Sequence, residues 1–316
     1  MLGLVWLDAG LFGMVGLLVG SFLNVVIYRL PKMMERQWAA ECAEHAASAA
    51  NAEAAVDISV DIGAGVDAVA DSNTKANVNA LAHMGPVAAA PFNLMVPRSA
   101  CQKCGHPIRW FENIPVLSYV FLRGKCASCG TRIAMRYPLV EIATGALFAF
   151  AGWRWGMTLT ATAWCAFSAA IVALAMIDWD TTLLPDDITL PLLWGGLIAA
   201  ALGLTSVPLA ASLWGAVAGY LSLWSVYWAF KLVTGKEGMG YGDFKLFAAL
   251  GAWFGWQALV PIILMASVIG AVVGIAMKFS SGLREGGYVP FGPFLAGAGV
   301  TAMVFGPQAI LRSVGL

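Results

Sequence analysis

Two aspartates stand at the ends of long uncharged stretches, where a charge is costly. Asp178 lies in "AMIDWDTTLLPDDITL" (residues 175–190), and Asp243 follows three alternating glycines in "GMGYGDFKL" (residues 238–246). An ionisable group at such depth in a membrane protein is a candidate functional group. Two carboxylates brought together can share one proton, so that one activates water as a base while the other polarises a carbonyl. The pair therefore predicts aspartic-protease chemistry, which requires neither a side-chain nucleophile nor a metal.

The glycines beside the second aspartate fit the same chemistry. Gly240 and Gly242 leave the backbone bare next to Asp243, which predicts that an extended peptide substrate approaches there. A structural interpretation competes with this one, because Gly-Asp before an apolar run is also a helix N-cap pattern and Asp178 sits where a span ends. Spacing alone does not separate the two interpretations.

The neighbouring acids are expected to have other roles. Asp180 lies two positions past the first candidate and should point to the opposite side of a continuing helix. Asp186 and Asp187 follow a proline at the next helix start, where capping is the expected role. Glu141, in the first turn of another apolar stretch, is expected to be structural, either supporting the site or pairing with a nearby arginine.

Four cysteines form a second candidate site. They occur as "CQKC" (residues 101–104) and "CASC" (residues 126–129). Two Cys-x-x-Cys pairs supply the four thiolates of a tetrahedral Zn²⁺ site. A disulfide is disfavoured on the reducing inner side of a membrane, and a redox role requires only one pair. Cys101, Cys104, Cys126 and Cys129 are therefore the predicted ligands of a zinc ion. Four thiolates leave no open position for water, so this zinc is expected to be structural and to replace a core that so short a segment lacks.

Three further residues are assigned ordinary roles. His106 lies near the first cysteine pair but is not needed as a ligand, so it is expected to be solvated or packed. Cys42 is expected to be a free thiol. Cys165 lies in the middle of an apolar run and is expected to pack as a small apolar residue.

Composition identifies the class of protein that must position these groups. The chain has 316 residues, of which 60% are hydrophobic and 11% charged, and its mean hydropathy is +0.77. Soluble domains carry about 25% charged residues. The sequence therefore predicts an all-α polytopic membrane protein.

Residues 9–28 are uncharged and long enough to cross a bilayer, and they lack the basic start of a cleaved signal, so a retained first helix is expected.

The later uncharged stretches set the expected number of crossings. Residues 188–230 are too long for one helix, and "TSVP" (residues 205–208) predicts a turn between two. Residues 246–277 form either one tilted helix or two short ones that turn near "GAWFGW" (residues 251–256). With two short helices there are about eight spans, and every Lys and Arg except Arg154 and Arg312 falls on one side, which the positive-inside rule makes cytoplasmic. Eight spans are therefore predicted.

These patterns divide the chain into four regions. Residues 1–30 are the first transmembrane helix, residues 31–95 a cytoplasmic linker, residues 96–136 the cytoplasmic four-cysteine zinc segment, and residues 137–316 the helical core. From about residue 39 to 91 the linker is Ala-rich with scattered acids and no large aromatic before Phe92. Such a composition favours disorder or loose helix over a domain. The short alternation "VDISVDI" (residues 56–62) is compatible with a strand, although a solvated linker is the preferred interpretation.

Taken together, the motifs resemble the type IV prepilin peptidases. The resemblance covers nearly the whole chain. Besides the two cysteine pairs and "GMGYGDFKL", it rests on "GSFLNVVIYRLPKMMER" (residues 20–36), "ENIPVLSY" (112–119), "RYPLVE" (136–141), "IDWDTTLLPDDITLPLLWGG" (177–196) and "VPFGPFLAGA" (289–298). The Ala-rich insert is longer than the family pattern. The Gly-x-Gly-Asp box taken alone also resembles presenilin-type proteases.

The resemblance implies a bifunctional enzyme of the bacterial inner membrane. Such an enzyme removes the basic leader of type IV prepilins or pseudopilins at the cytoplasmic face, then methylates the new N-terminal residue with S-adenosylmethionine. It implies Asp178 and Asp243 as the catalytic pair and the four cysteines as zinc ligands. The methyltransferase activity has no motif of its own here, since "GMGYG" lacks the spacing of a nucleotide-binding loop, and its cofactor-binding residues stay unknown. Protein substrates and the lipid bilayer are the expected partners, and no nucleic acid is expected.

Two other function classes compete with the peptidase. A proton- or cation-handling transporter would use the same acids as relay groups. A zinc-bearing assembly scaffold would have lost its chemistry. A presenilin-like protease with other substrates is the nearest enzymatic alternative.

Overall fold

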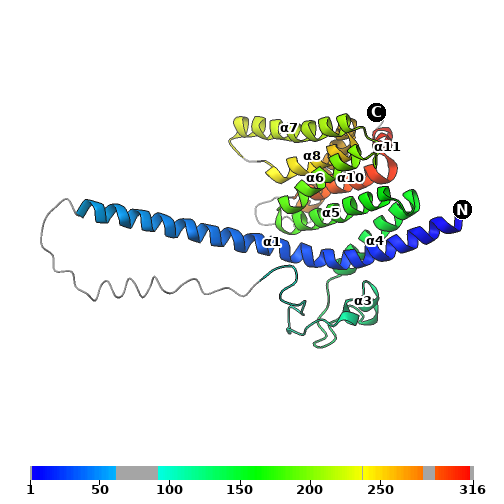
Figure 1. Ribbon diagram of the computed structural model, residues 1–316, viewed down its shortest axis with the longest axis horizontal. Helices are drawn as coiled ribbons and strands as arrows, with labels where there is room; N and C mark the ends of the chain where they lie inside the picture. Colours follow the sequence, from blue (N-terminus) through cyan, green and yellow to red (C-terminus); the bar gives the residue numbers. More distant parts are fainter. Residues whose placement is uncertain (1, 62–91, 237, 280–288, 314–316) are drawn as a thin grey trace. The chain divides into compact units, whose positions relative to one another are not determined.

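The structure is a computed structural model that describes residues 2–61, 92–236, 238–279 and 289–313. Within these ranges the chain is all-helical, with two isolated β-bridges and no strand, as the composition predicts. The elements in chain order are α1 (Leu2–Asp61), η1 (Trp110–Asn113), α3 (Leu117–Phe121), α4 (Arg136–Trp155), α5 (Leu159–Thr181), α6 (Asp186–Ala201), α7 (Leu209–Thr234), α8 (Tyr241–Phe254), η2 (Trp256–Ala258), α9 (Leu259–Phe279), α10 (Gly292–Phe305) and α11 (Pro307–Ser313). Figure 1 shows the helical bundle. The chain forms two compact units, residues 1–31 with 99–316, and residues 32–98.

Small residues let the first helix approach α4 closely. A side chain added at Gly16 would lie 2.7 Å from Cβ of Phe148, and one added at Gly20 would lie 2.7 Å from Cα of Glu141. Glycines at this helical spacing are the usual device for close packing of membrane helices. The apolar half of α1 is thereby fixed against α4, with Gly20 opposite Glu141.

Helices α6, α7 and α8 form a second tightly packed group, and α5 lies between α4 and α10. Gly215 of α7 meets Gly251 of α8 backbone to backbone. Two side chains reinforce the group, because Ser212 Oγ donates to the carbonyl of Ala252 at 2.6 Å and Trp253 Nε1 donates to the carbonyl of Leu192 at 2.8 Å. This packing buries α8 almost entirely, which gives the helix that carries Asp243 a fixed position.

The predicted breaks in the long apolar runs are confirmed. The first run divides into α6 and α7, with the turn at residues 202–208. The second divides into α8 and α9, because Gly255 adopts φ +81°, a conformation that ends a helix and that few other residues accept. Residues 246–277 therefore form two helices and not one.

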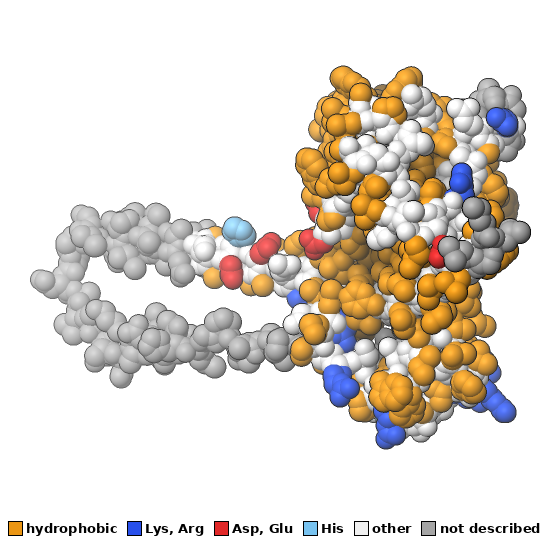
Figure 2. All heavy atoms as spheres, turned by 45° about the vertical axis from the view of Figure 1, so that its right-hand side comes forward, with side chains coloured by type: hydrophobic (Ala, Val, Ile, Leu, Met, Phe, Trp, Pro, Cys, Tyr) orange, Lys and Arg blue, Asp and Glu red, His pale blue; other side chains and the backbone are white. Residues whose placement is uncertain are grey.

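Length and composition qualify four of the described helical segments as candidate membrane spans: Val5–Ala49, Leu159–Thr181, Leu209–Thr234 and Trp256–Phe279. Helix α10 is a shorter apolar helix. The apolar side chains that gather on the molecular face in Figure 2 agree with a membrane protein.

In the second unit, helix α1 continues well past the predicted span and ends at Asp61. The first part of the Ala-rich insert is thus helical, and the strand considered for "VDISVDI" is wrong for the residues up to Asp61. Its abundant Ala and Glu are strong helix formers, which explains the continuation. In the same unit, the guanidinium of Arg36 lies 4.0 Å from the ring centre of Phe92. The rest of the insert, residues 62–91, lies outside the described residues.

Candidate functional site

The first candidate aspartate is held in place by a backbone donor. Asp178 lies near the C-terminal end of α5, and the residue is only 4% exposed. Its Oδ2 accepts a hydrogen bond from the backbone N–H of Gly292, the first residue of α10, at 2.9 Å. A side chain at Gly292 would lie 2.6 Å from the same oxygen, so only glycine permits this contact.

The second candidate aspartate is buried differently. Asp243 is the third residue of α8, and Gly240 is the N-cap of that helix, without a side-chain capping bond. The interpretation of Asp243 as the N-cap is therefore wrong. The side chain is buried, and Oδ1 is among the few buried polar atoms in the described residues that lack a hydrogen-bond partner. A buried carboxylate oxygen without a partner is costly, so it requires an explanation beyond helix stability.

The two carboxylates interact electrostatically, although they come from helices far apart in the sequence. Helix α10, whose first residue binds Asp178, packs against both α5 and α8. The fold thus brings the two sequence-predicted aspartates to one site. It adds Gly292, which the sequence analysis quoted only as part of a family motif.

The two glycines before Asp243 have different surroundings. A side chain at Gly242 would lie 2.6 Å from Cβ of Leu184, so this glycine is needed for helix packing. At Gly240 the nearest atom to an added Cβ is Asp243 Oδ2, at 3.9 Å, and the residue is exposed. Gly240 therefore has the open backbone that the sequence analysis expected of both glycines, while Gly242 is covered on one side.

The neighbouring acids form ion pairs away from this site. Asp180 binds Arg136 of α4 through two hydrogen bonds, of 3.0 and 2.6 Å. Asp186 receives the ammonium of Lys245 at 2.6 Å, and α6 has no side-chain cap, so the capping role predicted for Asp186 is wrong. Lys245 had not been singled out, because an isolated lysine at a helix start has no distinctive pattern.

Glu141 holds a strained turn of the four-cysteine segment. It is buried, and its Oε2 accepts the backbone N–H of Val116 at 2.7 Å. Val116 has φ +59° and ψ −47°, and the N–H of Leu117 bonds to the carbonyl of Pro115 across it. This is the rarer and strained form of γ-turn, which is unusual for a β-branched residue. The structural role expected for Glu141 fits this contact; of the two alternatives, an arginine partner is not the one found.

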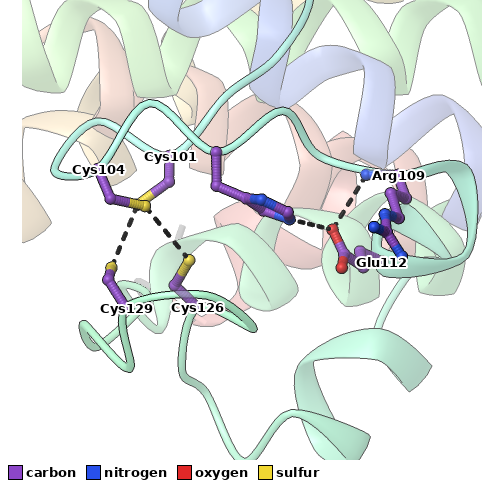
Figure 3. Close-up of polar contacts among 7 residues, drawn as sticks. Cys101, Cys104, Arg109, Glu112, Cys126 and Cys129 are labelled. Atoms are coloured by element: carbon purple, nitrogen blue, oxygen red, sulfur yellow. Dashed lines mark hydrogen bonds and ion pairs between the residues drawn. The ribbon is translucent and has the colours of Figure 1, made fainter.

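The four cysteines converge, as Figure 3 shows, from two turns that face each other. Their Sγ atoms all lie within 4.8 Å of one another, with Cys101 to Cys129 at 3.9 Å and Cys104 to Cys126 at 4.0 Å. A tetrahedral site with metal–sulfur bonds of about 2.3 Å requires sulfur atoms roughly 3.8 Å apart. The four thiols are therefore placed to hold one tetrahedral metal ion, and none is in a disulfide.

The two cysteine turns repeat the same backbone geometry. In each turn the N–H of the first cysteine donates to the carbonyl five residues later: Cys101 to His106, and Cys126 to Thr131. In each, the glycine after the second cysteine has positive φ, +71° at Gly105 and +69° at Gly130. The sequence pattern behind this repeat is short, Cys-x-x-Cys-Gly-x-x-Ile at residues 101–108 and 126–133.

Backbone and hydroxyl donors already favour thiolates at part of this site. The Thr131 hydroxyl and backbone amide lower the pKa of Cys129 to about 6. The backbone amides of Cys104 and Lys103 lower the pKa of Cys101. The His106 amide has the same effect on Cys104, but burial and the neighbouring sulfurs outweigh it and raise the pKa of Cys104 to about 11. A dication would reverse that repulsion, since it binds the deprotonated sulfurs.

The remaining polar residues of the segment support its shape. The backbone N–H of Arg109 donates to Glu112 Oε2 at 3.0 Å, and His106 Nε2 lies 3.4 Å from the same oxygen. The Arg109 amide, followed by His106, lowers the pKa of Glu112. His106 thus packs beside an acid and is not part of the sulfur cluster, as expected. Cys42 is exposed and Cys165 is buried, each as predicted.

Comparison with known proteins places the chain in a family. The model of the bacterial peptidase A24 N-terminal domain matches residues 14–155, and that of the type IV leader peptidase family matches residues 165–275. A prepilin leader peptidase/N-methyltransferase of Pseudomonas aeruginosa is 48% identical over 295 residues, which cover 93% of this chain and 89% of that protein. The protein of the same description from Aeromonas salmonicida is 46% identical over 309 residues, covering 96% and 93%. No solved structure matches. The chain belongs to the type IV leader peptidase family.

Proposed function

We propose that this protein is a membrane aspartic endopeptidase that removes the leader peptide of type IV prepilins or pseudopilins and methylates the new N-terminus. The observation that carries the peptidase half is the pair of buried, electrostatically linked carboxylates, Asp178 and Asp243, in a chain of this family. The substrate class comes from the relatives, whose name states both activities.

The unequal surroundings of the two aspartates support an assignment of roles. Asp178 accepts the Gly292 N–H, so it would be the carboxylate that takes a proton from the attacking water. Asp243 has a buried oxygen without a hydrogen-bond partner, so it would hold the shared proton and donate it to the carbonyl oxygen of the scissile bond. The open backbone at Gly240 supports the approach of an extended peptide beside Asp243.

We assign the four-cysteine cluster to a structural zinc ion. The close approach of the four sulfur atoms, all within 4.8 Å of one another, and the four thiol donors fit Zn²⁺, which in such a site has no open coordination position. The ion would stabilise residues 96–136, where η1 and α3 are short and contribute no buried hydrophobic residue. It would take no part in peptide hydrolysis.

The topology that fits these roles has about eight crossings, by α1 and α4 to α10. Both sites would then lie on the cytoplasmic side of a bacterial inner membrane. The distribution of Lys and Arg supports this orientation. The four proposed regions (residues 1–30, 31–95, 96–136 and 137–316) follow from it, with the peptidase site entirely within the last.

A single reaction tests both activities. The purified full-length protein is incubated with a prepilin that carries its leader, with and without S-adenosylmethionine, and the N-terminus of the product is read by mass spectrometry. Loss of the leader in both samples, with one added methyl group only when the cofactor is present, is expected. An intact substrate would refute the peptidase assignment, and cleavage without methylation would limit the protein to the first activity.

A further inference from the structure

The four-cysteine segment carries an apolar surface that its own fold does not bury. Trp110 and Phe121 are 81% and 82% exposed, and Phe111, Leu117 and Val120 are exposed between them. A cluster of large apolar side chains within twelve consecutive residues is unusual on a surface that meets only water. The segment contains η1 and α3, whose described residues include none that is buried.

The hydrogen bond from Val116 to Glu141 fixes the position of this surface along the membrane helices. Val116, in the middle of the apolar stretch, bonds to Glu141, and Glu141 is opposite Gly20 of α1. Gly20 lies within the uncharged run of residues 9–28 and eight residues before its end at Tyr28. Eight helical residues span about 12 Å. Val116 therefore lies alongside the membrane helices, well inside the level of Arg29, and attaches the apolar stretch there.

The charges around the apolar stretch are of one sign. Arg109, Arg123, Lys125 and Arg132 are exposed. Residues 99–135 contain one acid, Glu112, whose carboxylate faces the Arg109 amide and His106. Aromatic side chains flanked by arginine and lysine are typical of protein surfaces at the boundary between headgroups and hydrocarbon, where the bases meet anionic lipids.

We propose that residues 110–121 lie in the cytoplasmic leaflet of the membrane and contact lipid, so that the four-cysteine segment is an interfacial anchor and not a free cytoplasmic domain. Glu141 and the turn at Val116 set its depth, the apolar side chains enter the leaflet, and the surrounding bases bind anionic headgroups. The proposal rests on the cytoplasmic orientation given above but not on the peptidase chemistry. It also accounts for the strained turn, which points a hydrophobic loop along the helices.

Site-specific photocrosslinking tests the proposal. A photoreactive amino acid is introduced at Trp110 or at Phe121 of the full-length protein, and at Ala127 in the second cysteine turn as the control. The proteins are reconstituted into vesicles of phosphatidylcholine and phosphatidylglycerol, irradiated without substrate, and analysed by mass spectrometry. Lipid adducts are expected at positions 110 and 121, at several times the yield found at position 127.

The other outcomes overturn the proposal. Equal, low lipid yields at all three positions would place the loop in water. An adduct with a second copy of the chain in place of lipid would make the surface a protein-binding site. A zinc content equal to that of the unmodified protein verifies that the segment is folded. Because cleavage is not measured, an inactive enzyme would leave the result unchanged.

Discussion

The four-cysteine segment and the carboxylate site are built in opposite ways. The cysteines come from one short stretch, and each of the two turns that carry them is closed by hydrogen bonds within that turn. The carboxylate site takes one residue from each of three helices, and the bond between Asp178 and Gly292 joins residues 114 positions apart. Local backbone hydrogen bonds close both cysteine turns of the first site, whereas the second site leaves Asp243 Oδ1 buried without a hydrogen-bond partner. A site that holds an ion for stability can be self-contained, but a site for substrate needs a group that is still unpaired.

The largest effect is expected from removing the metal. Exchange of Cys101 for serine, or treatment with a strong chelator, should unfold residues 99–135, because structural zinc contributes about 10–16 kcal/mol of apparent binding free energy to such small units. Hydrogen exchange read by mass spectrometry should show fast exchange there and unchanged protection in α5 to α8. The matched control is Cys42→Ser, since Cys42 is exposed and outside the cluster. A Cys101→Ser protein with full zinc content and full protection would contradict the assignment.

The next largest effect is expected from substituting the two aspartates, which should lower the cleavage rate without lowering stability. Asp178→Asn and Asp243→Asn should each lower the rate of leader cleavage by at least about 100-fold, the lower range for loss of a general acid or base. Thermal unfolding should change little, because asparagine has the same shape. Asp180→Asn is the control, since Asp180 pairs with Arg136 on a partly exposed surface and should keep nearly full activity. Wild-type rates in either of the first two variants would remove the proposed mechanism.

A smaller effect, on stability, is expected at the contact between Glu141 of α4 and the four-cysteine segment. Glu141→Ala removes the acceptor of the half-buried Val116 N–H, at a cost of about 1 kcal/mol in the free energy of unfolding. Glu141→Gln keeps a side-chain carbonyl oxygen and should lose less. Amide exchange at residues 114–119 should speed up in the alanine variant while the zinc content is unchanged. Equal stability of the two variants would show that the strained turn does not depend on Glu141.

The same contrast explains what the sequence could predict. Cysteine spacing alone points to a metal site, so all four residues were found. The lengths of the uncharged runs predicted breaks near residues 205–208 and 251–256. Gly292 was missed as a partner of Asp178, because every residue has a backbone N–H and only the packing of α10 on α5 selects this one. The turn at Val116 was missed for a similar reason, since valine disfavours positive φ and only the contact with Glu141 maintains it.

The extension of α1 shows a different limit. Low complexity in the linker suggested disorder or loose helix, yet its first part continues a helix that packing has already started. Because propagation is much easier than nucleation, an Ala-rich segment attached to an existing helix extends it. Local composition could not reveal this, since the cause lies in the preceding residues.

The smallest effect separates the two glycines before Asp243. Gly242→Ala places a methyl group 2.6 Å from Cβ of Leu184, which should cost about 1–3 kcal/mol of stability through overpacking. Gly240→Ala meets no atom closer than 3.9 Å, so its cost should be limited to the weaker N-cap preference of alanine, up to about 1 kcal/mol. If substrate backbone passes over Gly240, that variant should also raise KM for prepilin, whereas Gly242→Ala should lower stability with KM unchanged. An unchanged KM would mean that the peptide reaches the aspartates from another side, and that glycine at position 240 serves only the start of α8.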